Sequence, residues 1–195
     1  DVAGALEGIL REDGIRLLNE TSMTAVEEAG GTITAHLEGD DAPARITGDE
    51  LLVAAGRGPN TDALNPGAAG VATTEQGYVQ VDARLATTAD GIYAIGDVTG
   101  GPAFTHVSYD DYRVLRDRLL AGAPTTTDNR ILSYTLFTDP QLGRVGLSEE
   151  QAHERGLDVA VARMPMAHVA RALEVDEPRG LMKAVIDSTT NRLLG

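Results

Sequence analysis

One short stretch constrains the fold most, because it ends an apolar segment in a carboxylate. The stretch reads DGIYAIGDVTGG and covers residues 90–101. Its apolar residues predict a buried strand over 92–96, and Asp97 follows directly. A carboxylate at the tip of a buried strand needs a partner. Ligands of open α/β sheets bind at the carboxyl ends of strands, so we expect a binding site here.

Gly96 and Asp97 suit a ligand that is rich in hydroxyl groups. Gly96 lacks a Cβ atom, so a ligand can approach its backbone, and Asp97 accepts hydrogen bonds from hydroxyl donors. A helix is predicted over 107–121, with its first turn near Thr105 and His106, and a helix N-terminus favours negative charge. Reduced flavin matches both features, through its ribitol hydroxyls and its anionic N1/O2 edge. The alternative is that Asp97 only caps a turn.

The remaining pattern predicts a mixed α/β and α+β chain. Before the central stretch we expect a helix at 2–13, a strand at 15–18, a hairpin at 22–39 and a second strand at 49–56. A short strand is expected at 77–82, and 123–129 reads as a linker. Beyond it we expect strands at 131–138, 142–147, 158–164 and 181–187, a third strand of the last sheet from Arg192, and a capping-box helix from Ser148.

Composition excludes several classes of function. The net charge is −14, which disfavours a nucleic-acid partner. No apolar run is long enough to span a membrane. The chain has no cysteine, and its four histidines do not follow a metal-binding spacing. Asp110 and Asp111 are interpreted as surface residues in the first turn of the central helix. Both ends of the chain read as cut.

Four motifs, in order, resemble the pyridine nucleotide–disulfide oxidoreductase family. TTADGIYAIGDV (87–98) is similar to its second flavin-contact motif, and LLVAAGRGPNTDAL (51–64) to its passage from the nicotinamide domain back toward the flavin. LFTDPQLGRVGLSEEQA (136–152) and VARALEVDEPRGLMKAVIDSTTNRLLG (169–195) resemble its dimerisation domain. The resemblance implies the end of a Rossmann-like NAD(P)-binding domain at 1–55, a central FAD-contacting segment at 56–124 and an incomplete α+β dimerisation domain with an antiparallel sheet at 125–195.

The resemblance also implies roles for individual residues. Asp97, beside Gly96, would bind the ribitol of FAD. Thr105, His106 and Val107 would bring the start of the helix to the flavin pyrimidine. On the nicotinamide side, the site would be lined by Gly56 and Arg57. The implied protein is a cytoplasmic homodimer that uses FAD and NAD(P)H and reduces a small-molecule disulfide or a metal ion.

The likeness favours mercuric reductases, through MPMAHVARALE (164–174), with dihydrolipoamide dehydrogenase as the alternative. The family's glycine fingerprints, its CxxxxC pair and its carboxyl-terminal His–Glu pair do not occur in these residues. No catalytic residue is therefore assigned in this chain. A second alternative is a non-catalytic module for dimerisation and binding.

Overall fold

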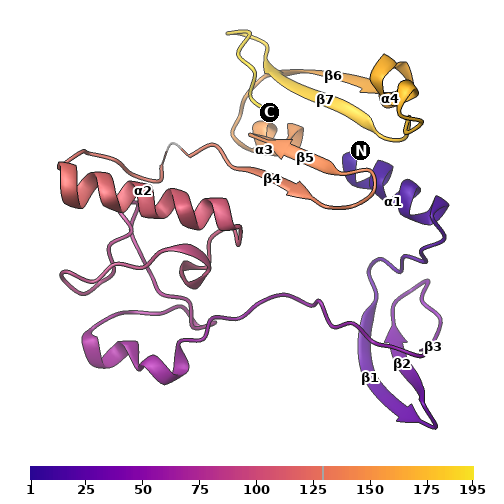
Figure 1. The fold of residues 1–195 in the computed structure, drawn as a ribbon, viewed down its shortest axis with the longest axis horizontal. Helices are drawn as coiled ribbons and strands as arrows, with labels where there is room; N and C mark the ends of the chain where they lie inside the picture. The colour runs from indigo at the N-terminus through magenta and orange to yellow at the C-terminus, as the bar shows by residue number, and fades with distance from the viewer. Residues whose placement is uncertain (129) are drawn as a thin grey trace. The chain divides into compact units, whose positions relative to one another are not determined.

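The computed structural model describes residues 1–128 and 130–195 (Figure 1). These residues form two compact units. Unit 1 comprises residues 1–55, 137–142 and 148–194, and unit 2 comprises residues 56–136, 143–147 and 195. The described residues combine helices with antiparallel sheets, as the sequence predicts. The three-part division at 55 and 124 stays a prediction. Position 129, the end of the expected linker, lies outside the described residues.

Unit 1 begins with helix α1 (Val2–Glu12), which confirms the predicted helix. The Asp1 side chain caps it by accepting a hydrogen bond from the Val2 N–H at 2.8 Å. Gly14 follows with a φ angle of +86°, the left-handed conformation that ends many helices. Ile9 is the buried residue of this amphipathic helix.

The predicted hairpin is also confirmed, as part of a three-stranded antiparallel sheet in unit 1. Its strands, in the order β1-β2-β3, are Ser22–Ala29, Thr32–Glu38 and Arg45–Gly48. Gly30 and Gly31 form the turn with positive φ angles. Ala35 is buried in β2, opposite Val26 of β1 and Ile46 of β3.

The carboxyl-terminal part of unit 1 pairs two long strands. Its elements are α3 (Glu149–Glu154), β6 (Val159–Pro165), α4 (Ala170–Glu174) and β7 (Leu181–Asp187). β6 and β7 form an antiparallel ladder, and α3 starts with the predicted capping box between Ser148 and Gln151. The third strand expected from Arg192 is reduced to one bridge between Ile186 and Leu193.

Unit 2 is built around helix α2 (Thr105–Ala121), which confirms the predicted helix. Short 3-10 helices precede it, and a two-stranded sheet follows: η1 (Asp62–Leu64), η2 (Pro66–Ala69), η3 (Gly96–Thr99), β4 (Ser133–Leu136) and β5 (Leu142–Val145). Leu142, the first residue of β5, belongs to unit 1. Val107 and Val114 are the buried apolar residues of α2.

Four predicted strands do not form. Residues 15–18 and 49–56 have no regular structure, and 77–82 and 92–96 are reduced to single bridges, Thr73 with Val79 and Ala86 with Tyr93. A strand needs a hydrogen-bonded neighbour, and no ladder forms at these segments within the described residues. The apolar run at 51–53 is consequently not buried, and the Leu52 side chain is 88% exposed. No helix among the described residues is long and apolar enough to cross a bilayer.

Candidate flavin-binding site

Gly96 opens η3 in a conformation and a space that suit glycine. Its φ angle is +71°, which residues with a Cβ atom rarely adopt. A Cβ atom built on Gly96 would lie 2.6 Å from Ser108 Oγ and 3.1 Å from Ser108 Cβ. The turn therefore brings its bare backbone against helix α2.

Asp97 differs from the aspartates of this chain that cap turns. Asp82 Oδ1 accepts hydrogen bonds from the backbone N–H groups of Arg84 (2.8 Å) and Ala86 (3.0 Å). No backbone N–H of the described residues donates to the Asp97 carboxylate. The turn at Asp97 is closed instead by its own carbonyl oxygen, which accepts from the Gly100 N–H at 3.1 Å. No cap by the Asp97 side chain is seen among the described residues, and this side chain is 43% exposed.

Arg57 lies beside Asp97, so the structure brings two predicted site residues together. Arg57 Nη2 is 3.4 Å from Asp97 Oδ2. Tyr78 holds this loop in place, because its hydroxyl donates to the Arg57 carbonyl oxygen at 2.8 Å and its ring lies against Gly100. Gly56 has a φ angle of +112° and open space where a side chain would project. Nothing in the sequence predicted that Tyr78 would contact this loop.

Helix α2 starts without a side-chain cap, in contrast to α1 and α3. Its N-cap residue is Phe104, whose side chain accepts no hydrogen bond. The N–H groups of Val107 and Ser108 donate to the Phe104 carbonyl oxygen at 3.0 and 3.1 Å. The N–H groups of Thr105 and His106 find no acceptor among the described residues. These two donors, with the positive end of the helix dipole, can bind an anionic group.

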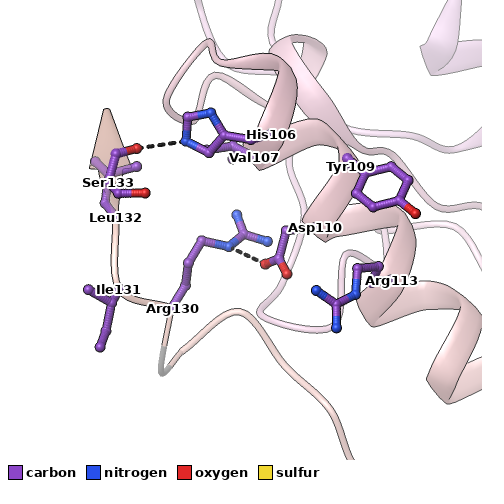
Figure 2. A pocket seen from close by; sticks show the side chains of 9 residues that line it. All are labelled: His106, Val107, Tyr109, Asp110, Arg113, Arg130, Ile131, Leu132 and Ser133. Carbon is purple, nitrogen blue, oxygen red and sulfur yellow. Dashed lines mark hydrogen bonds and ion pairs between the residues drawn. The ribbon is translucent and has the colours of Figure 1, made fainter. Parts of the chain in front are cut away.

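The side chains of this first turn of α2 are exposed, buried in the core or bonded to β4. Thr105 is exposed, whereas Val107 is 4% exposed and belongs to the core. The His106 ring stacks on Phe104 and donates from Nε2 to the Ser133 carbonyl oxygen at 2.6 Å (Figure 2). The Val107 N–H already donates to Phe104, so only the backbone N–H groups of Thr105 and His106 are available for the predicted role at the flavin.

Asp111, which contacts the Gly96 turn, is the residue that the sequence prediction placed wrongly. The first turn of α2 contains no acidic residue, and Asp111 is 3% exposed rather than on the surface. Its Oδ2 atom accepts from the Gly96 N–H at 2.8 Å, and its Oδ1 atom accepts from Arg130 Nη2. Helix spacing in the sequence could have predicted this burial, because residues 107, 111 and 114 share one helix face and two of them are valines.

Arg130 forms hydrogen bonds with two carboxylates of α2. Its Nε atom donates to Asp110 at 2.8 Å, and its Nη2 atom donates to Asp111 (Figure 2 shows the first contact). Partial burial disfavours the charge of Arg130, but the hydrogen bonds to Asp111 and Asp110 outweigh it and raise the pKa of the guanidinium. Arg130 thus stays charged and neutralises the buried carboxylate.

A pocket lies along the β4 side of α2 (Figure 2). It is lined by His106, Val107, Tyr109, Asp110, Arg113, Arg130, Ile131, Leu132 and Ser133. Gly56, Arg57, Gly96 and Asp97 do not line this pocket. Of the predicted site residues, the pocket therefore shares only His106 and Val107.

The residues of the candidate site fit a flavin nucleotide. The polar groups are complementary to it: the Asp97 carboxylate can accept hydrogen bonds from hydroxyl groups, and the N–H groups of Thr105 and His106 can donate to an anionic edge. Among the described residues, no group of three or more His, Asp or Glu residues could hold a metal ion.

Comparison with known families agrees with this geometry. Two family models together describe part of a nucleotide-binding oxidoreductase joined to a dimerisation domain. Residues 1–111 match the family model described as pyridine nucleotide-disulphide oxidoreductase, and residues 132–195 match the model of its dimerisation domain. The chain belongs to the pyridine nucleotide–disulfide oxidoreductase family, which confirms the resemblance.

Individual relatives share sequence over the whole chain. Identity is 42% with a probable pyridine nucleotide-disulfide oxidoreductase, RclA, of Escherichia coli, 35% with a mercuric reductase of Staphylococcus aureus and 30% with a dihydrolipoyl dehydrogenase of Geobacillus stearothermophilus. The chain covers 44%, 36% and 41% of these proteins. A solved structure of the E. coli RclA, described as an HOCl-induced flavoprotein disulfide reductase, matches with a TM-score of 0.89 at 41% identity, over all of this chain and 44% of that one. The chain thus spans less than half the length of its relatives.

Proposed function

We propose that this chain is part of a homodimeric, FAD-dependent NAD(P)H oxidoreductase. Hydride passes from the nicotinamide to the flavin, and electrons then pass to a disulfide or a metal ion, as in the mercuric-reductase-like members of the family. Membership in the family and the match to its dimerisation domain support the cofactor pair and the dimer. A cytoplasmic location is part of the same proposal.

The observation that carries this proposal is the Asp97 carboxylate. It follows the glycine turn, is partly exposed, and accepts no hydrogen bond from the described backbone, unlike the turn-capping Asp82. Its only described partner is the exposed side chain of Arg57. A carboxylate that the fold keeps accessible, next to an uncapped helix start, is available for a ligand.

Each residue contributes a separate part of flavin binding. Asp97 would accept hydrogen bonds from the ribitol hydroxyls, and the N–H groups of Thr105 and His106 would donate to the pyrimidine edge. Gly56 and Arg57 would line the nicotinamide side. Bound FAD supplies the chemistry of accepting a hydride and releasing electrons. The α2 dipole would stabilise negative charge on the reduced ring by about 1 kcal/mol.

The test is Asp97→Ala in the full-length protein, with Asp90→Ala as the matched control. Asp90 starts the same stretch, is exposed and has no described partner. We expect Asp97→Ala to lose FAD during purification or titration, and Asp90→Ala to retain it. Equal retention of FAD in both variants would remove the ribitol role of Asp97.

The final electron acceptor is tested separately. Oxidation of NAD(P)H by the full-length protein would be followed with Hg²⁺, Cu²⁺ or lipoamide as the acceptor. Similarity to mercuric reductases, and a solved RclA chain described as a Cu(II) complex, favour a metal ion. Activity with lipoamide alone would favour the dihydrolipoamide dehydrogenase alternative. A full-length dimer that binds no flavin would support the non-catalytic module.

A further inference from the structure

The buried Asp111 carboxylate connects three separate segments of unit 2. It lies on the apolar face of α2 between Val107 and Val114, where an unpaired charge would be strongly destabilising. One of its oxygens accepts from Gly96 at the start of η3, and the other accepts from Arg130, in the segment that leads into β4. Each oxygen thus fixes a different part of the chain to the helix.

The contact with Gly96 matters because glycine has little conformational preference of its own. Gly96 can adopt positive or negative φ angles with similar ease, so an external contact must select one. The hydrogen bond from its N–H to Asp111 selects the φ angle of +71°. Asp97 is the next residue, and the direction of its carboxylate depends on that angle.

Arg130 completes this arrangement by neutralising the carboxylate. Its side chain is 19% exposed, and the Asp111 side chain is 4% exposed, so the pair is well shielded from solvent. Without Arg130, an uncompensated negative charge would lie beside the turn and behind the start of α2. That charge would oppose the helix dipole where an anionic ligand edge is expected.

We propose that Asp111 is a positioning residue for flavin binding. Its carboxylate accepts the hydrogen bond from the Gly96 N–H and so holds the Gly96–Asp97 turn in its binding conformation, while Arg130 neutralises its charge. The proposal rests on the proposed role of Asp97. A turn that is ordered before the ligand arrives does not have to be ordered during binding, and preorganisation of this kind increases affinity. Asp111 touches no ligand itself.

The test compares Asp111→Asn with Asp110→Asn in the full-length protein. Both substitutions remove one negative charge from α2 and weaken one contact with Arg130, but only Asp111 contacts Gly96. Titration of the flavin-free protein with FAD gives the dissociation constant, and hydrogen exchange of the peptide that contains Gly96 reports the turn without flavin. We expect Asp111→Asn to weaken FAD binding roughly tenfold to hundredfold and to speed exchange at the turn, because a buried donor loses its charged acceptor. Asp110→Asn should change the dissociation constant by about twofold or less.

A second pair of variants covers the case in which Asp111→Asn does not fold. Arg130→Lys keeps a positive charge that can reach Asp111, whereas Arg130→Gln removes it. We expect Arg130→Gln to weaken FAD binding and Arg130→Lys to restore most of it. Equal dissociation constants in Asp111→Asn and Asp110→Asn, or in Arg130→Lys and Arg130→Gln, would overturn the positioning role while leaving the proposed function intact. Failure of the unaltered protein to bind FAD would overturn the proposed function itself.

Discussion

Arg57 Nη2 lies 3.4 Å from Asp97 Oδ2, so the residues predicted for the nicotinamide side and for the ribitol form one ion pair. The two side chains are 76% and 43% exposed. Ion pairs this accessible contribute little to stability, because water solvates both charges well. Hydroxyl groups of a ligand can therefore replace Arg57 at Asp97 at little cost.

The exposure of this ion pair predicts that Arg57 contributes much less than Arg130 to the free energy of unfolding. Arg57→Ala should change the free energy of unfolding by about 0.5 kcal/mol or less, since it removes an exposed ion pair. Arg130→Ala should cost about 2–4 kcal/mol, because it leaves the buried Asp111 carboxylate without its cation. Urea denaturation of the flavin-free, full-length protein would measure both values. Similar losses for the two variants would contradict the assignment.

Gly96→Ala is predicted to be strongly unfavourable. The new Cβ atom would meet Ser108 Oγ at 2.6 Å and would force a residue with a side chain into a φ angle of +71°. We expect a loss of about 2–4 kcal/mol in the free energy of unfolding, together with weaker FAD binding.

Gly4→Ala is the matched control for this substitution. Gly4 lies within α1, and a Cβ atom there would have no heavy atom within 4 Å. The same change of residue should stabilise the protein by about 0.5–1 kcal/mol, because alanine favours a helix. A Gly96→Ala variant as stable as Gly4→Ala would show that the turn tolerates a side chain.

The elements that the sequence predicted correctly are specified by local signals. Helix α1 has its cap at Asp1 and is followed by Gly14 in the left-handed conformation, and α3 has its capping box at Ser148. The strand at 49–56 was predicted from a continuous apolar run, but a strand depends on neighbours that the run itself cannot supply. Local pattern alone therefore overestimates strands wherever the described chain provides no ladder.

The candidate site was predictable to the same extent. Gly96 and Asp97 were identified from an apolar stretch that ends in glycine and a carboxylate, and the start of α2 from helix periodicity. Asp111 was misplaced because adjacent aspartates near a helix start resemble dipole-matched surface residues. Helix spacing places Asp111 with Val107 and Val114 on the buried face. Its cation, Arg130, lies 19 residues away in the sequence and has no local signal.

The capping box at α3 gives a prediction for unit 1. The Ser148 hydroxyl accepts from the Gln151 N–H at 3.1 Å, and the Gln151 side chain accepts from the Ser148 N–H at 3.1 Å. Ser148→Ala should lower the free energy of unfolding by about 1 kcal/mol, and Ser148→Asp should lose much less, because aspartate also caps helices. Urea denaturation would distinguish the two. Equal losses would show that the hydroxyl acts through packing rather than as a cap.

The contact between Lys183 and Glu149 predicts how acid affects unit 1. Lys183 Nζ lies 2.6 Å from Glu149 Oε2, and this hydrogen bond, against a smaller opposing effect of burial, lowers the pKa of Glu149 below its usual 4.5. A carboxylate whose pKa is lower in the folded state stabilises the fold above its unfolded pKa. That contribution is lost as the pH falls from 4.5 through the folded pKa.

Lys183→Met removes this interaction and should therefore change the shape of the pH profile. The variant should melt at a lower temperature than the unaltered protein at pH 7, and the difference should shrink as the pH falls below about 4.5. Arg171→Met is the control, because its partner Glu174 is 63% exposed, and its profile should run parallel to that of the unaltered protein. Circular dichroism melts between about pH 3 and pH 7 would test this. A Lys183→Met profile that stays parallel throughout would mean that Glu149 draws its stabilisation from Arg163 instead, which also contacts Glu149 Oε2.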